Sequence, residues 1–137
     1  MTDVPRKPAP VASPETAEYW AGAKRHELLI QRCSSCGHHQ FYPRVLCTTC
    51  SGRMLTWVQA SGRGTIRSYT VVRRPVSEAY APDVPYVVAL VALAEGPTMM
   101  SRIVGIDPEI VRIGRAVEVT FQNWTAEVSV PVFKPAD

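Results

Sequence analysis

All four cysteines of the chain lie in one stretch, as two Cys-x-x-Cys pairs separated by ten residues. The pairs are Cys33 with Cys36 and Cys47 with Cys50. Two intervening residues allow both sulfurs of a pair to point at one ion, so two pairs offer the four thiolates of a tetrahedral, structural Zn²⁺ site. Gly37 follows the first pair, where such a turn needs a residue that tolerates positive φ. Ser51 stands at this position in the second pair, so its turn is expected to differ slightly.

Other uses of these cysteines fit the pattern less well. Two disulfides would need four cysteines, but no signal peptide precedes them, and a redox Cys-x-x-Cys would follow a strand in a βαβ pattern without a second pair. The spacing alone does not distinguish zinc from iron of the rubredoxin type. His38 and His39 lie between the pairs and are interpreted as loop residues, because four sulfurs complete the ligand set. A closed set of four thiolates predicts an ion that holds the fold and takes no part in catalysis.

The composition is that of an ordinary globular protein. The 137 residues are 46% hydrophobic and 20% charged, with a formal net charge of +3. This charge is too small to indicate a nucleic-acid-binding tail, although it permits a local anion site. The longest apolar run, from Tyr86 to Ala94, has the length of a strand and falls short of the roughly 20 residues that span a bilayer. We therefore expect no membrane association. Because no signal sequence is recognised and all cysteines are assigned to a metal, we expect a cytoplasmic location.

Two elements are predicted before the cysteines. Residues 1–13 are rich in proline, show no periodicity and are predicted to form a flexible arm. A helix is predicted over 14–26, because Ser13 can cap its first turn and Pro14 suits the first helical position; its last turn should end near Lys24. The apolar stripe of this helix includes Trp20, which would pack either on the body of the chain or in a groove of a partner.

The cysteine pairs are predicted to sit on a zinc ribbon over residues 27–59. A strand over 27–32 leads into the first pair, and a strand over 54–60 leaves the second. The aromatic residues between the pairs, Phe41 and Tyr42, would cover the metal site.

Residues 60–137 are predicted to form a five-stranded OB-fold barrel. Period-two alternation and β-branched residues place strands at 65–72, 86–93, 98–104, 116–122 and 128–133. The sequence Asp107-Pro108-Glu109 predicts a helical turn between the third and fourth strands, which is the chain order of an OB-fold. A β-sandwich would need more strands than this segment holds. The strand over 86–93 is almost wholly apolar and is predicted to be buried on both faces, whereas 73–85 is predicted to be a long loop.

A zinc ribbon followed by an OB-fold is also typical of proteins that bind single-stranded nucleic acid. Such binding needs exposed aromatic rings and a basic groove. The available residues are Tyr69, Tyr80, Trp124, Arg63, Arg67, Arg73, Arg74 and Arg102. The arginines are scattered along the sequence, so this alternative rests on a weak signal.

Catalysis by the chain alone is not expected. General acid–base chemistry needs carboxylates or histidines brought together in a cleft. All three histidines precede residue 40, in or beside the cysteine module, and the acidic residues after it fall mostly in predicted turns. The sequence therefore offers no set of residues that meets the usual requirements of an active site.

The order of these motifs resembles one known family, the acyl-CoA-associated zinc-ribbon/OB-fold proteins once catalogued as a domain of unknown function. The resemblance spans residues 16–136. It rests on Tyr19-Trp20, on Leu29-Ile30-Gln31-Arg32 before the first cysteine pair, on Pro43-Arg44 before the second, on Gly62-Arg63-Gly64-Thr65, on Pro85-Tyr86-Val87-Val88-Ala89-Leu90-Val91, on Gly114-x-x-Val117-Glu118-Val119 and on Phe133-Lys134-Pro135-Ala136. Ser51 departs from the family's pattern, which has glycine there.

This resemblance implies a non-catalytic accessory subunit in a hetero-oligomer. Members of the family pair with thiolase-superfamily enzymes, including thiolases, acyltransferases and retro-aldolases that shorten sterol side chains, and help form or cover the path of the CoA thioester. The family has no catalytic residue to carry over to this sequence. Arginine binds phosphate through paired N–H groups, so Arg73 and Arg74 are predicted to contact the CoA phosphates. The 73–85 loop and the N-terminal helix, with Tyr19, Trp20 and Tyr80, are predicted to form the partner interface.

Overall fold

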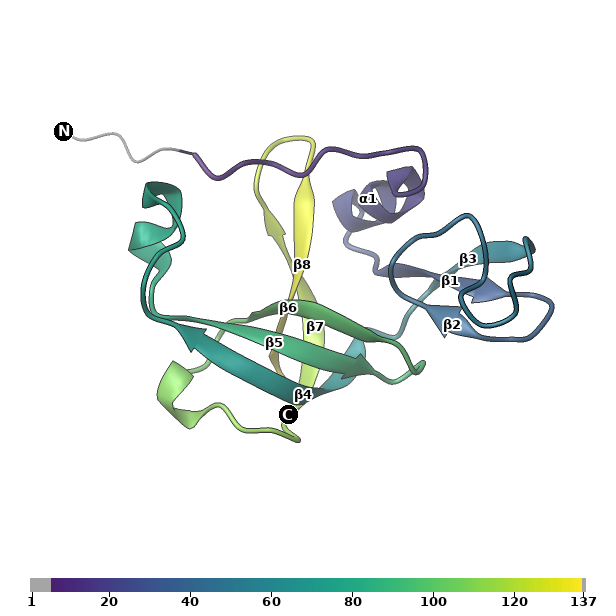
Figure 1. The fold of residues 1–137 in the computed structure, drawn as a ribbon. Coiled ribbons are helices and arrows are strands. Elements are labelled where there is room, and N and C mark those ends of the chain that lie inside the picture. The colour runs from purple at the N-terminus through teal and green to yellow at the C-terminus, as the bar shows by residue number, and fades with distance from the viewer. Residues whose placement is uncertain (1–5, 137) are drawn as a thin grey trace.

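The computed structural model describes residues 6–136, which form one helix, a small antiparallel sheet and a β-barrel (Figure 1). Helix α1 spans Ala17–Lys24 and ends where it was predicted to end. It begins later than predicted, because Ser13 and Thr16 form a turn of their own. In this turn the Ser13 N–H donates to Thr16 Oγ1 at 2.8 Å, and the Thr16 N–H donates to the Ser13 carbonyl at 3.1 Å. Serine and threonine side chains favour such local turns over the helical conformation.

The zinc ribbon is a three-stranded antiparallel sheet. Its strands are β1 (Leu29–Cys33), β2 (His39–Gln40) and β3 (Leu55–Gln59), in the order β2-β1-β3. The two long strands agree with the prediction. Strand β2 was not predicted, because a segment of two residues is too short to show an alternating pattern.

The five strands of the barrel confirm the predicted OB-fold. They are β4 (Arg63–Val72), β5 (Tyr86–Leu93), β6 (Thr98–Ile103), β7 (Ala116–Asn123) and β8 (Ser129–Pro135), in the closed order β4-β5-β6-β8-β7. The predicted helical turn between the third and fourth of these strands is the 3₁₀ helix η2 (Pro108–Ile110). The Asp107 side chain caps it by accepting the Glu109 N–H at 2.9 Å.

The prediction that β5 is buried on both faces is wrong. Val87, Ala89, Val91 and Leu93 point into the barrel and are buried, but the alternate residues are only partly covered, and Leu90 is 38% exposed. A barrel wall has one inner face, and no element among the described residues covers the outer face at Leu90. The apolar sequence of β5 therefore produces an exposed apolar strip.

The prediction that 73–85 is a long loop is also corrected. A 3₁₀ helix, η1 (Glu78–Asp83), forms in its second half and packs Ala79 into a buried position. A 3₁₀ helix of two turns shows no apolar periodicity, so the sequence pattern did not reveal it. Figure 1 shows η1 and α1 on the same side of the barrel, with the N-terminal arm running between them.

One hydrophobic core joins the ribbon to the barrel. Leu28 and Ile30, which lead into and lie in β1, belong to the same buried cluster as Ile66, Val91 and Phe133 of the barrel. The two sheets are therefore packed together and do not form independent cores. Among residues 6–136, no helix has the length and hydrophobicity needed to cross a membrane.

Candidate metal centre and adjoining groove

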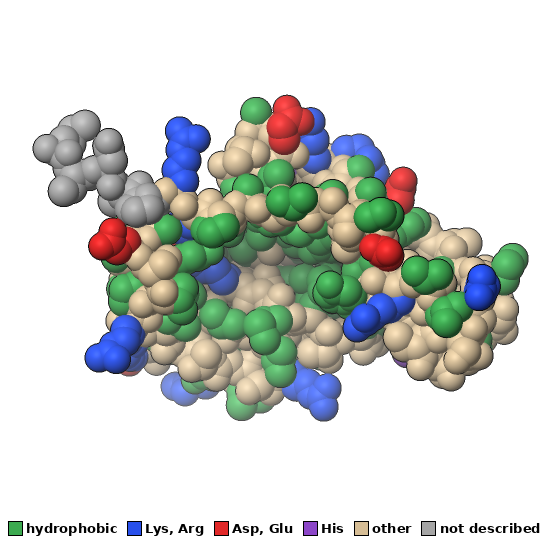
Figure 2. All heavy atoms as spheres, turned by 45° about the horizontal axis from the view of Figure 1, so that its top comes forward, with side chains coloured by type: hydrophobic (Ala, Val, Ile, Leu, Met, Phe, Trp, Pro, Cys, Tyr) green, Lys and Arg blue, Asp and Glu red, His purple; other side chains and the backbone are tan. Residues whose placement is uncertain are grey.

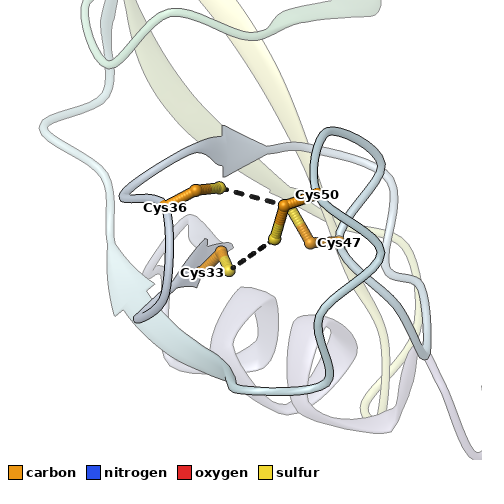
Figure 3. Close-up of side chains that lie close together, drawn as sticks. All are labelled: Cys33, Cys36, Cys47 and Cys50. Carbon is orange, nitrogen blue, oxygen red and sulfur yellow. Dashed lines mark hydrogen bonds between the residues drawn. The ribbon is translucent and has the colours of Figure 1, made fainter.

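The four cysteine sulfurs lie within 4.8 Å of one another. Figure 3 shows the four side chains pointing toward a common centre, two from each Cys-x-x-Cys turn. The Cys33–Cys50 and Cys36–Cys47 sulfur pairs are each 3.6 Å apart. With a Zn–S bond of about 2.3 Å, the edge of a tetrahedral site is about 3.8 Å, so the four sulfurs fit a Zn²⁺ ion.

The two Cys-x-x-Cys turns have the same backbone geometry. The Gly37 N–H donates to the Cys33 carbonyl at 2.8 Å, and the Ser51 N–H donates to the Cys47 carbonyl at 2.9 Å. Gly37 has a φ of 78°, as predicted, and Ser51 has a φ of 63°. The expected difference between the turns is therefore absent, because Ser51 adopts the conformation that glycine adopts in the first turn.

Backbone N–H groups favour the thiolate at Cys33 and Cys47, whereas the net pKa shift is upward at Cys36 and Cys50. The N–H of Cys36 lowers the pKa of Cys33 to about 6, and the N–H of Cys50 lowers the pKa of Cys47. The N–H of Gly52 likewise lowers the pKa of Cys50, but the adjacent sulfurs of Cys33 and Cys36 outweigh it and raise that pKa to about 12. Four thiolates this close repel one another, and a divalent cation at the centre removes the repulsion. This donor set is the structural zinc site that the sequence predicted.

Two buried glutamines hold the loop between the cysteine pairs. Gln40 Nε2 donates to Gln31 Oε1 at 2.8 Å, Gln31 Nε2 donates to the Arg44 carbonyl at 2.9 Å, and Gln40 Oε1 accepts the Thr48 N–H at 2.9 Å. Buried amides are retained where every polar atom finds a partner. Sequence reasoning missed this pair, because a glutamine in a short strand gives no pattern that distinguishes it from a surface residue.

An apolar groove lies outside the barrel, beside α1 and η1. It has a volume of about 350 Å³, and Figure 2 shows a hollow on this face with hydrophobic side chains gathered around it. Its walls come from α1, η1, β5, β6 and the β7–β8 hairpin. The residues that line it are Tyr19, Trp20, Tyr80, Val88, Met99, Met100, Ser101, Arg102, Gln122, Trp124, Val130, Pro131 and Val132.

A second hollow with a cationic side shares Trp124 with this groove. It has a volume of about 490 Å³ and lies between the N-terminal arm, η1 and the β7–β8 hairpin. Its lining includes Arg6 and Lys7. The Lys7 ammonium pairs with Asp83 at 2.9 Å and lies 5.5 Å from the centre of the Tyr80 ring. The described part of the predicted arm is thus extended and rests against the body of the chain.

The predicted interface residues have different surroundings. Tyr19 is 8% exposed and packs edge-on against Trp20 and Phe41, so little of its ring is left for a partner. Trp20 packs partly against the core of its own chain and lines the groove. Tyr80 is half-buried and lines the groove from η1.

The predicted phosphate contacts lie apart from the groove. Arg73 and Arg74 are exposed, and Arg73 pairs with Glu109 at 2.6 Å. Neither arginine lines the groove or the cationic hollow. The cations that do line these cavities are Arg6, Lys7 and Arg102, and sequence reasoning had assigned the first two to a featureless arm.

Two of the five arginines considered for nucleic-acid binding pair with acidic residues. Arg102 pairs with Asp83 at 3.3 Å and stacks on Tyr86 with 4.2 Å between the guanidinium carbon and the ring centre. Since Arg73 is also paired with an acidic residue, these side chains are partly neutralised. The geometry gives the nucleic-acid alternative no specific support.

Fold and site together define the chain as a zinc-ribbon/OB-fold protein. Two family models match it in sequence order: the rubredoxin-like zinc ribbon domain of ChsH2 over residues 20–56 and the C-terminal OB-fold domain of ChsH2 over residues 57–122. A DUF35 domain-containing scaffold protein of Methanothermobacter thermautotrophicus is 37% identical over 82% of this chain and 86% of its own length. The chain belongs to the DUF35 family, as the resemblance implied.

Other relatives are named as subunits of acyl-CoA enzymes. A probable enoyl-CoA hydratase alpha subunit of Thermomonospora curvata is 35% identical over 95% of this chain, which spans 40% of that protein. The 3-oxo-4,17-pregnadiene-20-carboxyl-CoA hydratase alpha subunit of Mycobacterium tuberculosis is 37% identical over 85% of this chain, which spans 37% of that protein. A chain of the solved Ltp2-ChsH2(DUF35) aldolase is 35% identical, with a TM-score of 0.84 over 93% of this chain and 99% of that chain.

Proposed function

We propose that this chain is a non-catalytic accessory subunit that docks on a thiolase-superfamily enzyme acting on acyl-CoA and helps to form its CoA-thioester site. The observation that carries this proposal is the apolar groove beside a cationic hollow, on a face that also exposes apolar strand residues. The names of the relatives support it, because they combine acyl-CoA chemistry with the words subunit, scaffold and aldolase.

The groove suits the acyl and pantetheine parts of an acyl-CoA. These parts are long, narrow and mostly apolar, and sites for such ligands are apolar with a few placed polar groups. The nucleotide end of CoA carries phosphates, which cationic side chains bind. Arg6 and Lys7 line the hollow that shares Trp124 with the groove, so we assign the phosphates first to Arg6 and then to Lys7, whose charge is shared with Asp83, in preference to Arg73 and Arg74.

The exposed strip on the outer face of the barrel suits a protein partner. Tyr69, Leu90 and Met100 are 37%, 38% and 67% exposed and line a shallow hollow of about 200 Å³. Leu90 and Met100 are paired across β5 and β6, and Met100 also lines the groove. A partner on this strip would therefore lie at the edge of the groove and could close it. We assign the docking surface to this strip together with Trp20 and Tyr80.

The same geometry favours a scaffold over an enzyme. Within the described residues, the cysteine site is the one grouping of metal-ligand side chains, and four thiolates leave a zinc ion no open position. His26 is stacked on Phe121 with 5.1 Å between ring centres and hydrogen-bonds Asn123 at 3.0 Å, which gives it a packing role.

A defined pair of proteins tests this function. The chain is co-expressed with a thiolase-superfamily acyl-CoA enzyme from the same organism, and the complex is followed by size-exclusion chromatography. We expect co-elution, loss of the complex with Leu90→Lys, and its retention with Arg112→Lys, an exposed conservative control outside the strip. Thioester turnover should require the partner. Turnover by the chain alone would contradict the non-catalytic role, and an unaffected Leu90→Lys complex would contradict the docking surface.

A further inference from the structure

The barrel has one weak seam, between β6 and β8. Strand β6 pairs with β5 from Thr98 to Ile103, but its ladder with β8 has a single pair, Ile103 with Phe133. Strand β8 pairs with β7 along the whole of its length. The facing edges of β6 and β8 therefore have no further ladder pair, and residues of both strands line the apolar groove.

The hydrogen-bond pattern shows which β6 groups face the seam. The Leu93 N–H donates to the Pro97 carbonyl at 2.9 Å, so odd-numbered residues of β5 face β6. Their partners in the register, Met99, Ser101 and Ile103, therefore bond to β5. Because peptide groups alternate between the two edges of a strand, the even-numbered residues of β6 face β8. The hydrogen bond that the Val104 N–H donates to the Phe133 carbonyl at 2.7 Å is consistent with this alternation.

Pro131 ends the ladder between β6 and β8. The next bond of this parallel ladder would run from the N–H of residue 131 to the Met100 carbonyl. Proline has no N–H, so this bond cannot form. The Pro131 carbonyl accepts a hydrogen bond from the Ser101 hydroxyl at 3.0 Å, across the seam between β6 and β8. The Met100 carbonyl is therefore left without this ladder bond, and Met100 is a residue that lines the groove and is 67% exposed.

A free donor lies two residues along the same strand. Arg102 Nε is buried and has no hydrogen-bond acceptor among the described residues, although the rest of the guanidinium pairs with Asp83 and stacks on Tyr86. Arg102 also lines the groove. On β6 the groove thus has the Met100 carbonyl without a ladder partner and, beside it, the buried Arg102 Nε without an acceptor.

The geometry points to β6 as the strand that pairs with the amide groups in the pantetheine arm of an acyl-CoA. The Met100 carbonyl accepts an amide N–H of this arm, and Arg102 Nε donates to an amide carbonyl of the same arm. This inference deepens the proposed function and rests on it. A strand edge with open peptide groups binds extended amide chains by adding them as a further strand. The pantetheine arm is such a chain, and it is thin enough for a groove that a folded partner could not enter.

Pro131→Ala tests this pairing. It gives residue 131 an N–H that can bond to the Met100 carbonyl and compete with the ligand. We expect the affinity for octanoyl-CoA, measured by isothermal titration calorimetry, to fall about fivefold, the size of one hydrogen bond. Octanoate has no amide and should bind both forms equally. Pro135→Ala removes another β8 proline, away from the groove, and should leave both affinities unchanged.

Carbon-13 NMR of the unchanged chain gives a second measurement. The Met100 carbonyl shift should move when octanoyl-CoA is added and stay in place with octanoate. Equal octanoyl-CoA affinity for Pro131→Ala and the unchanged chain, with a stationary Met100 carbonyl, would overturn the pairing and leave the acyl-CoA groove standing. Absence of octanoyl-CoA binding by the unchanged chain, alone and with its partner enzyme, would overturn both the pairing and the CoA role of the proposed function.

Discussion

Ser51 shows how one residue can adopt a backbone conformation that its side chain disfavours. Its φ of 63° lies in the left-handed region, where a Cβ atom crowds the following carbonyl. Its N–H nevertheless bonds to the Cys47 carbonyl at 2.9 Å, as the Gly37 N–H bonds to Cys33 in the first turn. The turn is therefore imposed by the need to bring two sulfurs to one ion, and the serine accommodates it.

Replacing Ser51 by glycine should stabilise the chain. Glycine adopts positive φ without the steric penalty, so we expect Ser51→Gly to raise the free energy of unfolding by about 1 kcal/mol. Chemical denaturation of the zinc-loaded chain measures this change. Ser51→Ala keeps the Cβ atom and should bring no gain; equal stabilisation by both variants would show that backbone strain is not the cause.

At the scale of elements, a small polar network joins the arm, η1 and β6. Asp83 at the end of η1 pairs with Lys7 of the arm at 2.9 Å and with Arg102 of β6 at 3.3 Å. The hydrogen bond from Lys7 lowers the pKa of Asp83, and Arg102 acts in the same direction. This network fixes one wall of the groove and holds the arm beside it.

The network predicts a pH-dependent difference in stability. A lowered pKa means that folding favours the Asp83 carboxylate, so its stabilisation is full above the ordinary aspartate pKa of about 3.9 and is lost as the pH falls through the folded value. We expect Asp83→Asn to lower stability by about 1 kcal/mol at pH 7, a difference that disappears in strong acid. Thermal denaturation across pH measures it.

Glu109→Gln is the matched control for this prediction. It breaks the Arg73–Glu109 pair, in which both side chains are well exposed, and should change stability little. A stability difference for Asp83→Asn that persists unchanged at pH 2 would show that the Asp83 charge is not responsible.

At the scale of the whole molecule, the ribbon and the barrel share one buried cluster. Leu28 and Ile30 pack into the same core as Ile66 and Phe133, so disorder in the ribbon exposes part of the barrel's packing surface. The zinc site therefore supports more than the short strands around it. This coupling also explains how a closed metal site can matter to a groove on the barrel, with which it shares no residue.

Removal of zinc should destabilise the whole chain. Binding of structural zinc is worth about 10–16 kcal/mol in small modules, comparable to the stability of an entire domain. We expect one zinc per chain by elemental analysis, and a single thermal transition that moves to lower temperature when a chelator is added. Cys47→Ser should behave like the chelated chain.

His38→Ala is the control for the ligand assignment. His38 is exposed and lies beside the cysteine pairs, so this variant should keep its zinc and its melting temperature. A barrel transition that stays in place after chelation would contradict the shared core, and loss of zinc from His38→Ala would contradict the set of four cysteines.

Local patterns were enough to predict most of the fold. Ligand spacing around Cys33 to Cys50 predicted the ribbon, and alternation in segments such as 86–93 predicted the strands, because metal coordination and strand pairing depend on short-range geometry. Helix η1, with six residues, and strand β2, with two, were missed because segments this short carry no periodic pattern. The start of α1 was misplaced because Ser13 bonds to Thr16 instead of capping the helix.

The sequence by itself determined the cysteine site, the order of ribbon and barrel, and the family, since each depends on residue types at fixed separations along the chain. Only the tertiary structure decided which cations face the groove, why the apolar β5 leaves Leu90 exposed, and how Pro131 leaves the Met100 carbonyl without a ladder partner. These features bring together residues from the arm, η1, β6 and β8. Their proximity depends on how the barrel closes. Because these residues are far apart in the sequence, no local sequence pattern predicts that they lie close together.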